Sequence, residues 1–146
     1  MRSHGNQECK LKSPEEIVDT MMAKDYFSQW LGIKVLETGN GISKLSMTVR
    51  KEMLNGFGIA HGGITYCLAD SALAFSSNSH GKKAVSVETS ISHTIPVSEG
   101  DELVAEAKEE HCSNKIGIYS ITVKRTSDNA VVALFKGTVY RTSKDW

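Results

Sequence analysis

The sequence predicts an α+β domain in which a long central helix is wrapped by a curved antiparallel sheet. Two observations lead to this prediction. The segment 64–79 is apolar on almost every helical face, so it should be covered on all sides. Two strand-like runs precede it and four follow, and short turns join the last four, which is typical of antiparallel neighbours.

Local signals define the elements before the central helix. Ser13-Pro14-Glu15-Glu16 has the spacing of a capped helix start, and this additional N-terminal helix is expected to run to about Ser28. Short strands are expected at 33–37 and 45–49, where apolar and polar residues alternate. A glycine-rich hairpin turn at 39–41 joins them.

Four strands are expected after the helix, and turn-forming residues fill the breaks between them. An open sheet of this kind has free edges, and pairing of edges across a dimer removes one of them. The sequence therefore predicts a homodimer. The four strands are expected at 84–95, 102–112, 116–125 and 130–141.

Composition limits the class of protein. A chain of 146 residues suits one domain, expected over residues 13–146 after a disordered segment at residues 1–12. Its 17 basic and 17 acidic side chains form no basic stripe, so neither nucleic acid nor a membrane surface is expected as a partner. The longest apolar stretch is too short to span a bilayer, and no signal peptide is recognised, so a cytoplasmic protein is expected.

The three cysteines are widely spaced and form no CxxC or Cys/His ligand pattern. The sequence therefore predicts neither a disulfide framework nor a metal site.

The segment NGFGIAHGGITYCLAD, residues 55–70, carries the candidate chemistry. Gly62 lies in the first helical turn, where backbone N–H groups lack partners and the helix dipole is positive. Such a position can hold an anion or stabilise an oxyanion, although paired glycines also occur as plain loop residues. Asp70 is a carboxylate in an apolar helix, which is costly unless it is hydrogen-bonded to a loop or takes part in a reaction.

Gly62 and Asp70 are too far apart to act on one group within one subunit. Eight residues of helix separate them by about 12 Å, whereas a base and an oxyanion donor must both lie within about 3 Å of the reacting atoms. Two such helices placed antiparallel across a dimer axis would bring Gly62 of one subunit beside Asp70 of the other.

The segment 55–70 is followed by the strand 84–88, by Pro96 and by Gly100-Asp101. With these motifs the chain resembles the hotdog-fold acyl-CoA thioesterases, in the PaaI-like branch of phenylacetate degradation. The resemblance covers residues 26–141 and rests on spaced motifs in the right order. It implies the hydrolysis of an acyl-CoA thioester, of aryl-acetyl or medium- to long-chain type, to free acid and CoA. It also implies no cofactor, because coenzyme A is part of the substrate, and a homotetramer built from two dimers. The motifs are Asn55, His61-Gly62-Gly63, Leu68-Ala69-Asp70, the strand 84–88, Pro96 and Gly100-Asp101.

The resemblance assigns roles to these residues. The N–H of Gly62 donates to the thioester carbonyl, and Asp70 of the opposing subunit acts as general base or nucleophile. Asn55 and His61 help to orient water and the thioester. Further substrate contacts are expected from Gly63, Tyr66, Leu73, Ser86, Val87 and Glu88, with Tyr66 and Leu73 as walls of the acyl pocket.

One motif departs from the family. An arginine often precedes the proline after the central strand, but this chain has His93-Thr94-Ile95-Pro96 there. His93 is therefore expected to be a structural strand residue at the interface. Contacts to the CoA phosphates are expected instead from Lys82, Lys83, Arg125 or Lys136.

Two other functions fit the same fold. One is an acyl-CoA-binding hotdog protein without turnover. The other is a hotdog dehydratase, which uses a His/Asp or His/Glu pair that His61 and Asp70 superficially resemble. Asn55 and the double glycine favour hydrolysis over dehydration. The sequence alone does not separate aromatic from fatty acyl groups.

Overall fold

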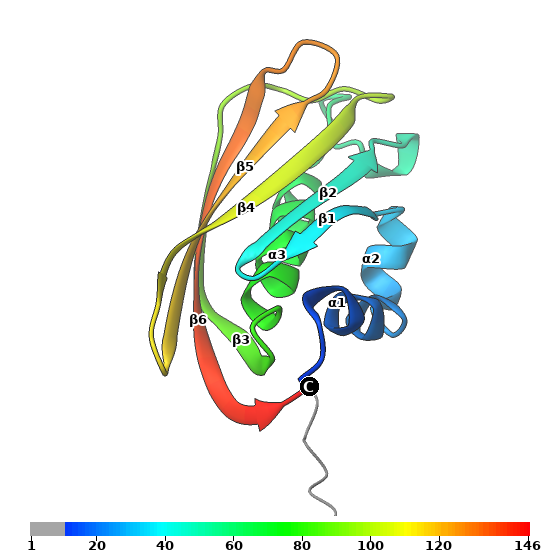
Figure 1. Cartoon of the computed structure of the whole chain (residues 1–146). Coiled ribbons are helices and arrows are strands. Elements are labelled where there is room, and N and C mark those ends of the chain that lie inside the picture. Colours follow the sequence, from blue (N-terminus) through cyan, green and yellow to red (C-terminus); the bar gives the residue numbers. More distant parts are fainter. Residues whose placement is uncertain (1–10) are drawn as a thin grey trace, which may run out of the picture.

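Residues 11–146, which the computed structural model describes, form a six-stranded antiparallel sheet that curves around one long helix (Figure 1). The strand order β1-β2-β4-β5-β6-β3 makes β1 and β3 the two edges. The predicted α+β class with a wrapped central helix is confirmed. The elements are α1 (Pro14–Met22), α2 (Tyr26–Leu31), β1 (Lys34–Gly39), β2 (Ile42–Thr48), the 3₁₀ turn η1 (Lys51–Met53), α3 (Gly62–Asn78), β3 (Lys82–His93), β4 (Glu102–Cys112), β5 (Ile116–Arg125) and β6 (Val131–Asp145).

The prediction of a disordered segment at residues 1–12 lies outside the described residues, except for its last two positions. Within residues 11–146, none of the helices combines the length and the apolar character required to cross a membrane.

The predicted single helix over residues 13–28 is wrong, because α1 ends at Met22 and α2 begins at Tyr26. Asp25 starts the second helix. Its carboxylate accepts hydrogen bonds from the backbone N–H of Ser28 at 2.9 Å and from the hydroxyl of Ser28 at 2.7 Å. This cap satisfies a donor that has no partner within the helix. Gly32 then ends α2 in the left-handed conformation, with φ of 74°.

The sheet follows the predicted strands closely. β4 and β5 occupy the expected residues, whereas β3 begins and ends two positions earlier than expected. β6 continues to Asp145 because its last residues pair with the start of β3, where Lys82 lies opposite Asp145. A turn at Asn40 and Gly41 joins β1 to β2, and Gly41 has φ of 72°, which favours glycine.

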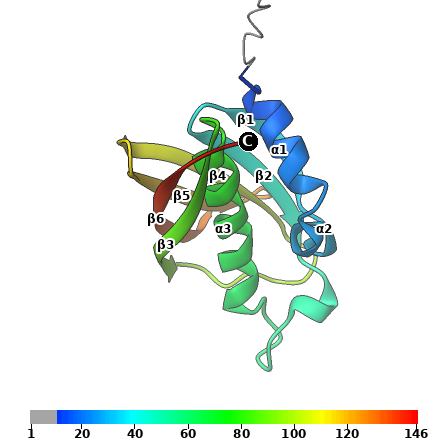
Figure 2. The ribbon, with the colours of Figure 1, turned by 90° about the horizontal axis from the view of Figure 1, so that it is seen from below.

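α3 packs its apolar side chains into the concave face of the sheet, and Leu68, Leu73 and Phe75 are almost completely buried. The expectation that this helix is buried on all sides is wrong for the single chain. A stripe along one face remains only half-buried, because the sheet ends at β3. Figure 2 shows α3 between β3 on one side and α2 on the other. The stripe consists of Gly63, Tyr66, Cys67, Asp70 and Ala74.

Candidate active site

The start of α3 leaves one backbone donor free. His61 is the N-cap, and its imidazole Nδ1 accepts a hydrogen bond from the N–H of Gly63 at 2.9 Å. The N–H of Ile64 donates to the carbonyl oxygen of His61 at 2.9 Å. Within residues 11–146, no hydrogen bond engages the N–H of Gly62. The first helical N–H is thus available at the positive end of the helix dipole.

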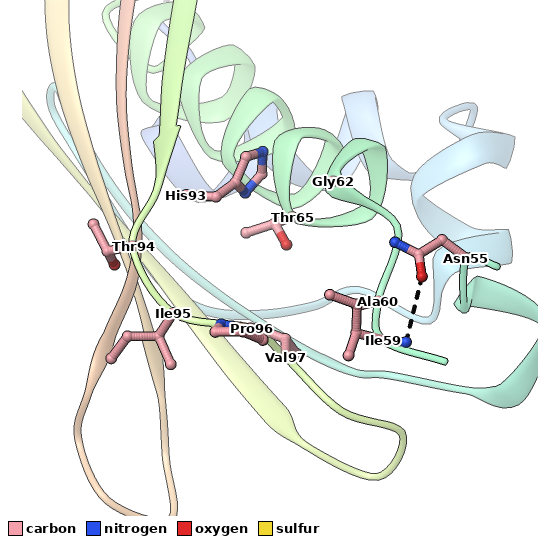
Figure 3. Close-up of a pocket in the computed structure, with 10 residues that line it drawn as sticks. All are labelled: Asn55, Ile59, Ala60, Gly62, Thr65, His93, Thr94, Ile95, Pro96 and Val97. Carbon is pink, nitrogen blue, oxygen red and sulfur yellow. Dashed lines mark hydrogen bonds between the residues drawn. The ribbon is translucent and has the colours of Figure 1, made fainter. Parts of the chain in front are cut away.

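Gly62 and Asn55 line the same cavity, of about 280 Å³ (Figure 3). The Asn55 side-chain carbonyl accepts hydrogen bonds from the backbone N–H groups of Phe57 at 2.9 Å and Ile59 at 3.4 Å. These bonds shape the loop before α3 and leave the side-chain NH₂ group as a donor, on the side of the helix start in Figure 3. The cavity is lined by Asn55, Ile59, Ala60, Gly62, Thr65, His93, Thr94, Ile95, Pro96 and Val97.

His93 reaches this cavity from the end of β3, and sequence reasoning left it out of the site. Its Nε2 atom lies 3.1 Å from the position that a Cβ on Gly62 would occupy. The ring therefore packs directly against the helix start (Figure 3). The available signal in the sequence was the position of His93, at a strand end shortly before Pro96.

Asp70 lies further along the same helix and faces a different, smaller cavity of about 60 Å³. Leu73 and Ser86 line this cavity together with Asp70, and the cavity shares no lining residue with that of Gly62. By the helical rise, about 12 Å separates the two positions. The geometry of one chain thus keeps the backbone donor and the carboxylate apart. The smaller cavity is lined by Asp70, Leu73, Ala74, Ser77, Ala84, Ser86 and Val139.

The carboxylate of Asp70 is half-buried, and no hydrogen bond engages it within the described part of the chain. Burial raises the pKa of Asp70, and the negative charge of Asp25 raises it further. Asp25 is the N-cap residue of α2. It holds the hydroxyl of Ser28, which lies 2.8 Å from the hydroxyl of Ser71. A raised pKa, together with a carboxylate that has no hydrogen-bond partner among the described residues, is frequent at functional sites, and Asp70 has both.

His61 and Gly63 lie apart from both cavities. They line a third one, of about 280 Å³, together with η1 residues and Cys67. Because His61 Nδ1 is bonded to the N–H of Gly63, the imidazole stabilises the helix start in this chain. The structure therefore separates His61 from the cavity of Gly62 and Asn55.

Tyr66 is held beneath the edge of the sheet. Its hydroxyl lies 2.5 Å from the hydroxyl of Thr89, and its ring packs edge-on against Phe135 with centroids 5.4 Å apart. Val87 and Glu88 are exposed on the edge strand β3, next to a bulge in its pairing with β6. Tyr66, Val87 and Glu88 therefore lie outside the cavities lined by Gly62 and by Asp70.

Two of the four cations expected at the CoA phosphates are engaged elsewhere. Lys82 and Arg125 form ion pairs with carboxylates at 2.6 and 2.8 Å. Among the described residues, Lys83 and Lys136 form no ion pair.

Comparisons with known proteins agree with this architecture. The sequence pattern of the thioesterase superfamily matches residues 57–132. A protein of Archaeoglobus fulgidus that carries an esterase name is 43% identical, over 94% of this chain and 88% of its own length. The acyl-coenzyme A thioesterase PaaI of Escherichia coli is 36% identical, over 83% of this chain and 86% of its own length.

Solved structures show the same fold. The PaaI protein from the phenylacetic acid degradation operon of E. coli superimposes with a TM-score of 0.88 and 32% identity, over 90% of this chain and 95% of that one. The protein smu.793 of Streptococcus mutans, solved with acetyl-CoA bound, gives a TM-score of 0.75 and 25% identity, over 78% and 91% of the two chains. The chain therefore belongs to the thioesterase superfamily, as an enzyme of its hotdog-fold, PaaI-like acyl-CoA thioesterases.

Proposed function

We propose that this enzyme hydrolyses an aryl-acetyl-CoA or a medium- to long-chain acyl-CoA, and that the N–H of Gly62 stabilises the oxyanion. The observation that carries the proposal is the first N–H of α3, which has no hydrogen-bond partner among residues 11–146 and lies at the wall of a cavity. When a thioester carbonyl is attacked, its oxygen gains negative charge, and a preorganised donor at a helix N-terminus stabilises that charge. The NH₂ group of Asn55 is a second donor at the same cavity.

The base is Asp70 of a second copy of the chain. In its ionised form the carboxylate takes a proton from water as the water oxygen attacks the carbonyl carbon; the alternative is direct attack by the carboxylate. The C–S bond then breaks, and the CoA sulfur leaves as a thiolate that takes up a proton. Support comes from the half-buried, unpaired state of Asp70 and from its distance to Gly62 along one helix.

A two-fold dimer supplies the second copy. The stripe on α3 is half-buried in the single chain, and Val85 and Val87 on the adjoining edge strand are 57% and 61% exposed. An antiparallel pair of helices across a two-fold axis would cover both surfaces and place Gly62 beside the partner's Asp70. We further propose a tetramer of two such dimers, a cytoplasmic location, and no cofactor beyond the CoA of the substrate.

Support for the proposed substrate class comes from the named relatives. E. coli PaaI belongs to a phenylacetic acid degradation operon, and smu.793 binds acetyl-CoA. The proposed function includes phenylacetyl-CoA for that reason. Leu73 lines the cavity of Asp70, and the ring of Tyr66 is the second wall that we propose for the acyl pocket. Such apolar walls would accept either an aromatic or an aliphatic acyl group.

An acyl-CoA panel tests the reaction. The purified enzyme is supplied with phenylacetyl-CoA and with saturated medium- and long-chain acyl-CoAs, and thiol release is followed with a chromogenic thiol reagent. Turnover that is lost in Asp70→Asn supports the proposal. Tight binding without turnover would identify an acyl-CoA-binding protein, and hydration of a 2-enoyl-CoA would identify a dehydratase; either result overturns it.

Mixed dimers test the shared site. Gly62→Pro and Asp70→Asn chains are inactive alone under the proposal, but each mixed dimer contains one intact site and one doubly damaged site. Random mixing then restores about a quarter of the wild-type activity, since half of the dimers are mixed and half of their sites are intact. Activity that stays at the sum of the two separate variants contradicts a site shared between subunits.

A further inference from the structure

We propose that His80, Glu109 and Cys112 form a binding site for a divalent transition-metal ion of the zinc type. Their ligand atoms, an imidazole nitrogen, a carboxylate oxygen and a thiol sulfur, all lie within 4.8 Å of one another. His80 lies just beyond the C-terminal end of α3, whereas Gly62 starts that helix, about 25 Å away by the helical rise. The proposed metal site is thus separate from the thioesterase cavity of the same chain.

A bulge in β4 brings two of the ligands to one side of the strand. Residues three apart in a regular strand point to opposite faces of the sheet. Between Glu109 and His111 the pairing with β5 slips by one residue, because Glu109 lies opposite Tyr119 and His111 lies opposite Ile118. The inserted residue turns Cys112 back to the side of Glu109. The spacing of Glu109 and Cys112 along the sequence is therefore not a recognisable metal-ligand pattern, but the bulge in the folded strand places both side chains on one side.

The carboxylate of Glu109 is held in place from several directions. The hydroxyl of Tyr119, a fully buried residue, donates to Glu109 Oε2 at 3.0 Å. The hairpin turn at Gly41 packs so closely against this carboxylate that a Cβ there has no room. Burial and the charge of Glu109 raise the pKa of Tyr119, so the phenol remains a donor. Support of a ligand carboxylate by an outer hydrogen bond is a regular feature of protein metal sites.

The chemistry of the donors favours zinc or cobalt. Nitrogen, oxygen and sulfur ligands suit a borderline-soft ion, and solvent can supply a fourth ligand because the His80 and Glu109 side chains are 24% and 25% exposed. His80 Nε2 and Glu109 Oε2 are in hydrogen-bond contact in the chain. A bound ion would replace the proton between them.

Metal binding would also displace the proton of the Cys112 thiol. Burial raises the pKa of Cys112, with Arg141 opposing and Glu109 adding to the shift. Metal binding forms the metal–sulfur bond and releases the proton of the Cys112 thiol to solvent. The guanidinium of Arg141 donates to the carbonyl oxygen of Ser113 at 2.6 Å, which anchors this cation on the turn after Cys112.

Cobalt titration tests the site without reference to thioesterase activity. Metal-stripped enzyme titrated with Co²⁺ is expected to bind one ion per chain and to develop the visible bands of tetrahedral cobalt with a thiolate-to-cobalt charge-transfer band. Zinc is expected to displace it and to raise the melting temperature. Cys112→Ser should abolish the charge-transfer band, and His80→Gln should weaken binding at least tenfold. Tyr119→Phe should weaken it about tenfold through the lost outer hydrogen bond.

The control is His111→Gln, which removes the exposed histidine beside Cys112 and should leave the titration unchanged. Circular dichroism of each variant checks that the fold is retained. Absence of cobalt and zinc binding in the wild type overturns the proposal. So does a charge-transfer band that persists in Cys112→Ser, or one that is lost in Cys67→Ser instead.

Discussion

The imidazole Nε2 of His93 lies 3.1 Å from the position that a Cβ atom on Gly62 would occupy. Gly62 begins α3 and His93 ends β3. Their close contact therefore joins the two elements at the wall of the cavity that both residues line with Asn55 (Figure 3). A Cβ atom at position 62 would therefore crowd the imidazole of His93, which must shift by a few tenths of an ångström to admit it.

This approach predicts an energetic coupling between the two residues. Gly62→Ala is expected to lower the free energy of unfolding by about 0.5–1 kcal/mol, because the added methyl group crowds the imidazole. In a His93→Ala background the same change should be neutral or slightly stabilising, since alanine restricts the unfolded chain more than glycine does. Denaturant unfolding of the four proteins in this cycle measures the coupling. Equal costs in both backgrounds would contradict it.

The second prediction concerns the activity of a variant that lacks the proposed oxyanion donor. Gly62→Pro deletes the N–H group, and a proline suits the first helical position because the preceding His61 already has an extended conformation, with φ of −57° and ψ of 136°. The variant is expected to fold and to lose about 10²–10³ in kcat. Gly62→Ala is the matched control, since it also adds a Cβ but keeps the N–H. A proline variant as active as the alanine variant would remove Gly62 from the mechanism.

Asp70→Asn makes a third prediction, which concerns activity and stability together. The amide cannot accept a proton from water, so kcat/KM is expected to fall by at least about 10². Burial raises the pKa of Asp70, so the folded chain binds its proton more tightly than the unfolded chain does. Wild-type stability therefore rises as the pH falls through the raised pKa toward the ordinary carboxyl range.

The asparagine variant has no such titration and should be the more stable protein at neutral pH. The difference is expected to stay below about 1 kcal/mol, because the carboxylate is only half-buried, and to disappear in acid. Denaturant unfolding at several pH values measures it. A variant less stable than the wild type at neutral pH would mean that Asp70 has a stabilising partner.

Local patterns were sufficient for most of the fold, and long-range contacts explain what they missed. The bounds of β4 and β5 follow from alternation and turn residues alone. The break before α2 was missed because the cap at Asp25 lies inside a continuous helical pattern. The open stripe on α3 depends on where the sheet ends, which apolar periodicity does not report.

Sequence proximity indicates which site residues lie near each other only where they belong to one segment. Asn55 and Gly62 are close in sequence and line one cavity, whereas their roles in hydrolysis stay a prediction. The expectation that His93 is a structural strand residue does not include its contact with Gly62. That contact depends on how β3 lies against α3, which the sequence pattern does not report. The bulge that aligns Glu109 with Cys112 depends likewise on pairing with β5, so a sequence search for metal ligands had no spacing to detect.

Asp25→Asn makes the last prediction, on the pH dependence of hydrolysis. The charge of Asp25 contributes to the raised pKa of Asp70, and the asparagine removes that charge while remaining a good N-cap for α2. The pKa of Asp70 should therefore fall. If Asp70 acts as an ionised base or nucleophile, the acidic limb of kcat/KM should move to lower pH. Asp19→Asn on the exposed face of α1 is the matched control and should leave the limb in place. An acidic limb that is unchanged in Asp25→Asn, or that moves to higher pH, would show that a group other than Asp70 controls it.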